Sequence, residues 1–356
     1  MRRVIYLLTA TAAGASPPFA SIVMRYPGVD EAQSREICEA GQLCVPASRI
    51  LWEKIREHMP DAKTIVDVGA NKGLVSAELL YQYAPSCGVD SASLRGEVKQ
   101  YFEERGVNAT PGGPCGAYHG RSPLFPDPSL CETSAVRVHS FEPNHHLVAM
   151  NRALNRARHV WRWHASAVSD FDGEAQFYTV WHEGSHLSRI NTSDTVSVRV
   201  VRLDTWAKHH LARDADVDVL KIDAEGHDGA TLAGAFHLFT ARRIGLVIFE
   251  VPLQYPLHFG LHALLRDDDL LDFFEAVEMT CYVLGYNAHV LLSHGANRTL
   301  RLNGLRRKRS KCRQARNYAC VNYRTRPALA DALLRRSLAY THFTLLRDNR
   351  TDDNLT

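Results

Sequence analysis

A short glycine-rich turn follows the first apolar run of the chain and has the pattern of a ligand-binding turn. Residues 65–68 include three β-branched side chains, which is typical of a buried parallel strand. The run ends at Gly69-Ala-Asn-Lys-Gly73, and residues 74–81 then show helical spacing. Strand, turn and helix together bring backbone N–H groups up to a nucleotide-like ligand, and we expect the glycines to allow its close approach. The spacing is neither that of a phosphate loop nor that of the G-x-G-x-x-G motif, so it favours a cofactor without a pyrophosphate. S-adenosylmethionine is the leading candidate.

Charged residues follow two later apolar runs. Residues 136–141 end in Phe-Glu-Pro-Asn, where Glu142 is placed to accept hydrogen bonds from both hydroxyls of a ribose. The structural alternative for Glu142 is a carboxylate that stabilises the N-terminus of the following helix. A run that begins at Asp218 ends in Lys221, Asp223 and Glu225. Because charges are costly inside a strand, we expect these three at its carboxyl end, facing the crevice where doubly wound folds bind ligands.

The motifs and their order resemble the FkbM family of S-adenosylmethionine-dependent methyltransferases, across roughly residues 61–295. They are Asp-Val-Gly-Ala-Asn-x-Gly, Phe-Glu-Pro-Asn, Leu-Lys-Ile-Asp-x-Glu-Gly and Val-Ile-Phe-Glu. The resemblance implies methyl transfer to a hydroxyl of a sugar, a polyketide or a related metabolite. It also implies a set of residues that hold S-adenosylmethionine: Asp67, Gly69, Asn71, Gly73, Glu142, Ser166 and Ala167. Two features depart from the family: 75 positions separate Asp67 from Glu142, and Asp228 stands where the family favours Glu.

Methyl transfer to a hydroxyl needs in-line positioning and removal of the hydroxyl proton. We expect Asp223 near the sulfonium end of the donor and Glu225 or His227 as the base. Lys221 either pairs with a carboxylate or binds the acceptor. Glu250 ends another apolar run, where it could face the acceptor or hold a following loop through backbone N–H groups.

A second group of polar residues has the types that bind a metal but not the expected placement. The three residues are His182, Glu183 and His186. Two histidines four positions apart could bind one metal ion from the same face of a helix, but this segment is a predicted loop, so we predict no metal site. Ser185, in the same segment, matches the family and is expected to line the pocket.

Alternation of strands and helices predicts an α/β fold with a Rossmann-like, doubly wound, mostly parallel sheet, the class I methyltransferase fold. An insertion at 84–134, rich in Pro, Gly and Ser, interrupts it, with one helix expected at 98–105. A hairpin is expected at 282–293. The other expected strands are 136–141, 160–165, 174–181, 196–203, 217–222 and 245–250, and the other helices are 145–157 and 228–240. The chain is predicted to begin with a signal peptide or short anchor at 1–15 and a lead-in at 16–60, which packs on the sheet through Trp52. The methyltransferase domain follows at 61–295, then a basic extension at 296–347 and a tail at 348–356.

The N-terminus and the cysteines favour the secretory pathway. Arg2-Arg3 precedes an apolar segment that is too short for a comfortable membrane span and ends in Ala13-Gly-Ala15, as in a cleaved signal; an uncleaved anchor and a mitochondrial presequence are the alternatives. Eight cysteines without a C-x-x-C pair suggest disulfides, and we expect one inside the insertion, between Cys115 and Cys131. Five glycosylation sequons agree with this compartment: Asn108, Asn191, Asn297, Asn349 and Asn354. The need for a methyl donor favours the Golgi or endoplasmic reticulum lumen over the exterior.

Composition leaves the acceptor open. A net charge of +3 and the lack of a nucleic-acid motif argue against a nucleic-acid partner. Nine basic residues between Arg298 and Arg316 form either a solvated loop or a rim that attracts an anionic glycan. Two alternatives to an O-methyltransferase are a non-catalytic lumenal binding protein on the same fold and a nucleotide-sugar enzyme. The retained carboxylates argue against the first, and the missing pyrophosphate turn argues against the second.

Overall fold

The structure, a computed structural model, describes residues 49–87, 91–106, 131, 134–155, 157–178, 186–188, 195–251, 273–284, 289–291 and 316–336. The expected signal segment, the five sequons, Ser185 and nearly all of the basic stretch lie outside these ranges. Among the described residues, no helix has both the length and the apolar character that a membrane crossing requires.

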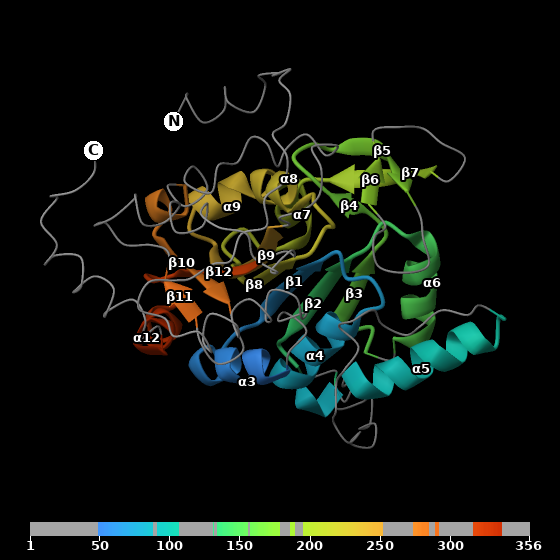
Figure 1. The fold of residues 1–356 in the computed structure, drawn as a ribbon, viewed down its shortest axis with the longest axis horizontal. Helices are drawn as coiled ribbons and strands as arrows, with labels where there is room; N and C mark the ends of the chain where they lie inside the picture. Colours follow the sequence, from blue (N-terminus) through green and yellow to red (C-terminus); the bar gives the residue numbers. More distant parts are fainter. Residues whose placement is uncertain are drawn as a thin grey trace, which may run out of the picture.

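An eight-stranded sheet forms the centre of the described fold, in the order β11-β10-β12-β9-β8-β1-β2-β3 (Figure 1). From β3 to β9 the neighbouring strands are parallel, and β12 then pairs antiparallel with β9. The strands are β1 (Thr64–Val68), β2 (Arg137–Phe141), β3 (Trp161–His164), β8 (Val217–Ile222), β9 (Ile244–Val251), β10 (Met279–Leu284), β11 (His289–Leu291) and β12 (Arg316–Asn322). This is the predicted doubly wound, mostly parallel sheet of the class I methyltransferase fold, and β10 with β11 forms the predicted hairpin.

Helices cover both faces of this sheet, as Figure 1 shows. One face carries α3 (Arg49–His58), α4 (Leu74–Tyr83), α5 (Ser91–Glu103), α6 (His145–Leu154) and α12 (Pro327–Arg336). The other carries α7 (Leu203–His210), α8 (Asp228–Gly234) and α9 (Phe236–Thr240). Trp52 and Ile55 of α3 are buried in the first of these two cores, as expected of the lead-in. The strands between the two cores are buried on both sides, and every residue of β8 is buried.

Two of the expected strands do not join the central sheet. Residues 173–178 and 195–201 pair with each other in a separate four-stranded sheet, in the order β4-β7-β5-β6. Its strands are β4 (Ala167–Val168), β5 (Gly173–Tyr178), β6 (His186–Ser188) and β7 (Thr195–Val201). Exposed residues alternate with buried ones in β7, so this sheet has one solvated face, and such strands favour antiparallel pairing at the surface over a place between two helical layers.

The helices differ from expectation at their ends. The predicted helix at 228–240 is two helices that meet at Ala235, and the predicted helix at 145–157 ends at Leu154. Asn155 explains the second difference, because its side chain donates to the carbonyl of Trp161 and accepts from the N–H of Ala157. These bonds compete with the helical pattern and turn the chain toward β3.

The insertion belongs to the helical layer as far as it is described. Helix α5 begins at Ser91, seven residues before the expected helix, and packs against α4 and α6 through Leu94, Val98 and Phe102. A disulfide does lie within the insertion, but it joins Cys131 to Cys87 and not to Cys115. The short 3₁₀ helix at Pro85–Cys87 follows α4 directly and brings Cys87 to within a Cα–Cα distance of 4.7 Å of Cys131. A second disulfide joins Cys281 of β10 to Cys320 of β12, which are direct cross-strand partners.

Candidate active site

The glycine turn between β1 and α4 is shaped by contacts with β2 and β8. The backbone N–H groups of Gly69 and Ala70 both donate to the carbonyl of Phe141, at 3.0 Å. Gly69 has φ +70°, and a Cβ built on it would lie 1.8 Å from the carbonyl oxygen of Asp223. Gly73 has φ +78°, and a Cβ there would meet the ring of Trp163. The glycines are therefore needed for packing against protein, and the expectation that they also allow close approach of a ligand stays a prediction.

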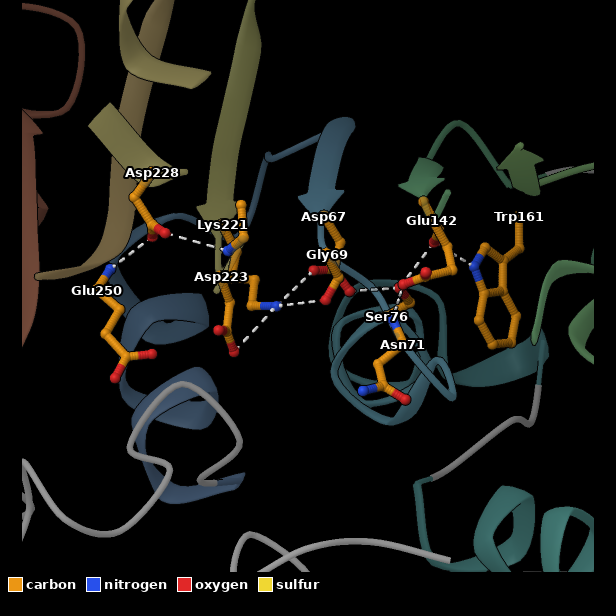
Figure 2. Close-up of polar contacts among 12 residues, drawn as sticks. Asp67, Gly69, Asn71, Ser76, Glu142, Trp161, Lys221, Asp223, Asp228 and Glu250 are labelled. Atoms are coloured by element: carbon orange, nitrogen blue, oxygen red, sulfur yellow. Dashed lines mark hydrogen bonds and ion pairs between the residues drawn. The ribbon is translucent and has the colours of Figure 1, made fainter. Parts of the chain in front are cut away.

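A buried chain of polar contacts runs beneath this turn (Figure 2). Ser76 of α4 donates to the carboxylate of Asp67 at 2.5 Å and contacts the hydroxyl of Ser140 at 2.7 Å. The indole N–H of Trp161 donates to the same hydroxyl at 2.7 Å. Asp67 and both serines are fully buried, so these contacts supply the partners that water would supply at the surface. Asp67 thus lies below the turn and holds it in place.

Lys221 connects this buried network to the carboxyl end of β8. Its ammonium lies 3.0 Å from the carboxylate of Asp67, 3.3 Å from the carbonyl of Gly69 and 3.6 Å from the carboxylate of Asp223. The lysine side chain is only 2% exposed. Burial lowers the pKa of Lys221, but Asp67 and Asp223 outweigh it and raise the pKa overall, so the ammonium stays charged. Of the two roles expected for Lys221, the structure shows the ion pair.

Glu142 lies at the end of β2 and faces the glycine turn. One carboxylate oxygen accepts the N–H of Asn71 and the other accepts the N–H of Asn144, both at 2.8 Å. Burial raises the pKa of Glu142 to about 7, although the two backbone N–H groups oppose that rise. Asn144 is the N-cap of α6, so Glu142 also plays the structural part considered for it at a helix N-terminus.

Two amide oxygens near Glu142 have no donor among the described residues. They are Oδ1 of Asn71 and Oδ1 of Asn151, and both atoms are buried. The side chains are linked, because the amide of Asn151 donates to the carbonyl of Asn71 at 2.9 Å. Buried acceptors without a donor are costly in a finished structure. A ligand with hydroxyl or ammonium donors would satisfy them, which fits a ribose or an amino acid group.

Ser166 and Ala167 follow β3 at the same edge of the sheet. Both are buried, and the N–H of Ser166 donates to the carbonyl of His164 at 3.0 Å. His164 also accepts the N–H of Glu142, so the end of β3 lies beside the end of β2. Ala167 begins β4 and pairs with Val200. The seven residues assigned to the donor are therefore distributed over three adjacent strand ends.

The expected catalytic residues follow β8. The N–H of Asp223 donates to the carbonyl of Val68, which extends the pairing with β1 by one step. Glu225 has φ +49° and Gly226 has φ +93°, so the chain turns sharply there. His227 is the N-cap residue of α8 and makes no capping bond through its side chain. A non-glycine residue with positive φ is uncommon and is often found at functional sites.

Asp228 joins the end of β8 to the end of β9. One carboxylate oxygen accepts the N–H of Glu250 at 3.0 Å and the other accepts the N–H of Ala224 at 3.2 Å (Figure 2). Burial, followed by the charge of Asp223, raises the pKa of Asp228 to about 7. Burial also raises the pKa of Glu250, to about 9, and the carboxylates of Asp223, Asp228 and Glu225 add to the rise. Glu250 thus lies close to the carboxylates that follow β8, and its expected role facing the acceptor stays a prediction.

The sequence motifs do not include the two buried hydroxyl groups of the site, those of Ser76 and Ser140. Ser140 stands in an otherwise apolar run, and a polar side chain in a buried strand needs a partner, which is the signal that could have singled it out. Ser76 carries no such signal, because a serine in a helix is ordinary. Of the three residues considered as metal ligands, only His186 is described, in β6. Among the described residues, no group of three metal-binding side chains occurs.

The strand order and the carboxylates at one edge define a class I methyltransferase fold. Residues 115–275 match the methyltransferase FkbM domain family, which supports the resemblance drawn from the motifs. The match covers Glu142 and the segment from Lys221 to Glu250 but begins after the glycine turn, so it is narrower than the resemblance at 61–295. No curated protein matches the chain.

Two solved structures show weak similarity. The methyltransferase FkbM from Methylobacillus flagellatus is 14% identical, with a TM-score of 0.29, over 60% of this chain and 38% of its own length. The chain therefore spans well under half of that protein. An uncharacterized protein from Burkholderia thailandensis is also 14% identical, with a TM-score of 0.23, over 94% of this chain and 69% of its own. The fold class rests on the strand order and register described above.

Proposed function

We propose that the protein is an S-adenosylmethionine-dependent O-methyltransferase that acts on a hydroxyl of a sugar, a glycan or a related metabolite. The observation that carries the proposal is that one edge of the central sheet has two parts with different polar residues, one suited to the donor and one suited to the acceptor. The ends of β1, β2 and β3 present Asn71, Glu142 and Ser166, whereas the ends of β8 and β9 present Asp223 and Glu250. Ligands bind at this edge in doubly wound folds.

Donor binding is supported by the two buried amide oxygens. Asn71 and Asn151 offer acceptors for ligand hydroxyl or ammonium groups, and Glu142 adds a carboxylate that accepts charge-assisted hydrogen bonds. Gly69, Gly73 and Asp67 act indirectly, since they fix the backbone of the turn. S-adenosylmethionine would supply a methyl group on a positively charged sulfur, and transfer to a hydroxyl forms the oxygen–carbon bond, leaves the sulfur–carbon electron pair on sulfur and releases the hydroxyl proton.

The carboxylates after β8 supply acceptors for that proton. A sugar hydroxyl is a poor nucleophile, so a base that removes its proton accelerates the transfer, typically by about 10²–10⁴-fold. Asp223 is the best placed, because its side chain is 40% exposed while its partner Lys221 is buried. Carboxylates on this side favour an uncharged hydroxyl acceptor. An anionic acceptor would need the cations of residues 298–316, nearly all of which lie outside the described ranges.

For the compartment we propose the Golgi or endoplasmic reticulum lumen. The disulfides between Cys87 and Cys131 and between Cys281 and Cys320 support an oxidising environment. A cytosolic location predicts four free thiols at these positions, and non-reducing peptide mapping of the protein isolated from its own cells distinguishes the two.

Calorimetry with S-adenosylmethionine, NAD and a UDP-sugar tests the donor. We expect binding of S-adenosylmethionine alone, and Glu142→Gln should weaken it by roughly 1.5–3 kcal/mol because a charged acceptor is lost. Glu103→Gln, which changes an exposed carboxylate on α5, is the matched control. Binding of the UDP-sugar instead supports the nucleotide-sugar alternative. A screen of glycans with isotopically labelled methyl donor then identifies the acceptor, and donor binding without any transfer would favour the non-catalytic alternative.

A further inference from the structure

The register of the sheet brings two carboxyl groups opposite each other. Strands β8 and β9 are parallel, and Lys221 pairs with Ile248. Asp223 follows directly after β8, and continuing this register past the end of the strand puts it level with Glu250. Neighbouring strands are about 4.8 Å apart, and residues in register point to the same face. Figure 2 shows the two side chains pointing the same way from the ends of β8 and β9. Two ionised carboxylates placed side by side repel each other, so one of them is expected to keep its proton.

Asp228 holds the ends of the two strands in place through hydrogen bonds to their backbone. It is 2% exposed, and its two oxygens accept one N–H from the segment after β8, at Ala224, and one from β9, at Glu250 itself. A single buried carboxylate thus sets the spacing between the two strand ends. Because both of its oxygens are used by backbone groups, its role is positional.

The surroundings decide which member of the pair keeps the proton. The ammonium of Lys221 lies 3.6 Å from Asp223 and favours a negative charge there. Glu250 faces Asp223 and Glu225 after β8 and Asp228 of α8, all acidic, and its partner on β12 is the uncharged Asn317. Negative charge is therefore stabilised on Asp223 and opposed on Glu250.

We propose that Glu250 is a neutral carboxylic acid that donates a hydrogen bond to Asp223, and that Asp228 is the positioning residue that holds the pair together. Taken with the proposed function, on which this step rests, the pair assigns the base to Asp223. The acceptor hydroxyl loses its proton to the Asp223 carboxylate while Glu250 keeps its own. Lys221 and Glu250 hold Asp223 from two sides and leave its exposed part for the acceptor.

The protonation of Glu250 can be measured without donor or acceptor. Protein labelled with ¹³C at the glutamate carboxyl carbon is titrated by NMR, and the signal missing in Glu250→Gln identifies Glu250. We expect its midpoint near pH 9, the value to which burial and the three carboxylates raise the pKa. Asp228→Asn removes one of those charges and should lower the midpoint, whereas Asp228→Glu keeps the charge and should leave it raised. A midpoint near pH 4.5 in the wild type overturns the proposal.

Methyl transfer to the acceptor found in the glycan screen tests the division of roles. Asp223→Asn should reduce turnover by ~10²-fold or more, because it removes the base. Glu250→Gln keeps a neutral donor and should reduce turnover less than about tenfold, with activity that persists at higher pH than in the wild type. A loss in Glu250→Gln as large as that in Asp223→Asn would show that Glu250 does more than donate a hydrogen bond, and would overturn the proposal. Failure to bind S-adenosylmethionine would instead reject the proposed function, and the NMR titration would still decide on the pair.

Discussion

The α-carbon of Gly69 lies against the carbonyl group of Asp223, so closely that a Cβ on Gly69 would come within 1.8 Å of the carbonyl oxygen. The contact joins the turn assigned to the donor with the strand end assigned to the base. The N–H of Asp223 also donates to the carbonyl of Val68, so the backbone of residue 223 is held on both sides by the segment that precedes the turn. A change at Gly69 is therefore expected to disturb both halves of the site.

Gly69→Ala should destabilise the fold by about 2–5 kcal/mol and abolish donor binding. The positive φ costs an alanine about 1–2 kcal/mol, and overpacking against a backbone carbonyl adds about 1–3 kcal/mol. Gly96→Ala on α5 is the matched control, since a Cβ there meets nothing within 4 Å and should slightly stabilise the helix. Urea unfolding and calorimetry measure both effects. If Gly69→Ala lost only affinity, with normal stability, the ligand and not Asp223 would be what requires the glycine.

Lys221→Met should destabilise the protein by about 3–5 kcal/mol, because it leaves the fully buried carboxylate of Asp67 without its counter-charge. Combining it with Asp67→Asn removes the uncompensated charge and should recover much of the loss, as measured by urea unfolding of the four proteins of the double-mutant cycle. Additive losses in the double variant would show that the pairing of Lys221 with Asp67 contributes nothing.

The central sheet could be predicted from the sequence because its strands are buried on both faces. Continuous apolar runs such as 65–68 and 217–222 identify such strands regardless of what surrounds them. The runs at 174–181 and 196–203 have strand propensity too, but propensity does not say which sheet a strand joins. That choice depends on long-range pairing, here of Gly173 with Val200.

The charged residues of the site were predictable for a similar reason, and their partners were not. Lys221 and Asp223 stand out because charges at the end of an apolar run need an explanation. Their contacts depend on register between strands far apart in sequence, so the ion pair of Lys221 with Asp67 and the backbone contacts of Asp228 could be found only in the structure. The disulfide of the insertion was predictable in part for the same reason. Three cysteines in the insertion predict a bridge, but the choice of Cys87 as the partner of Cys131 depends on how α4 ends.

Glu225→Gly separates a structural from a catalytic role for Glu225. The residue has φ +49°, which glycine adopts without strain, so stability should rise by about 1 kcal/mol or less. If Glu225 were the base, turnover should nevertheless fall by ~10²-fold or more. Arg242→Gly, at φ +59° and away from the site, is the control for relief of strain without an effect on turnover, and it also removes an ion pair with Glu278. Unchanged turnover in Glu225→Gly would exclude Glu225 as the base and leave Asp223 and His227 as candidates.

A pair of buried histidines makes the stability of the fold sensitive to acid. His139 of β2 and His164 of β3 lie with ring nitrogens 3.2 Å apart and both pack against Trp206. Burial lowers the pKa of His139 to about 3 and that of His164 to about 4, from 6.5 in the unfolded chain, and neighbouring cations add to the effect. A hydrogen bond between the two rings needs one nitrogen to donate and the other to accept, so at least one ring must stay neutral.

The free energy of unfolding should therefore fall as the pH drops below about 6.5. In that range the histidines of the unfolded chain bind protons that the buried rings of the folded protein do not. Each unit of pKa difference between the two states costs about 1.4 kcal/mol of stability. The loss continues until pH 3–4, where the rings of the folded protein titrate. His139→Phe keeps an aromatic ring against Trp206 but cannot titrate, so its stability should depend less on pH, even if it is lower at pH 7.5. His209→Gln, at the exposed end of α7, controls for the loss of a surface histidine. Urea unfolding at pH 7.5 and pH 5.0 gives the comparison, and an equal pH dependence in wild type and His139→Phe would show that the buried pair is not its source.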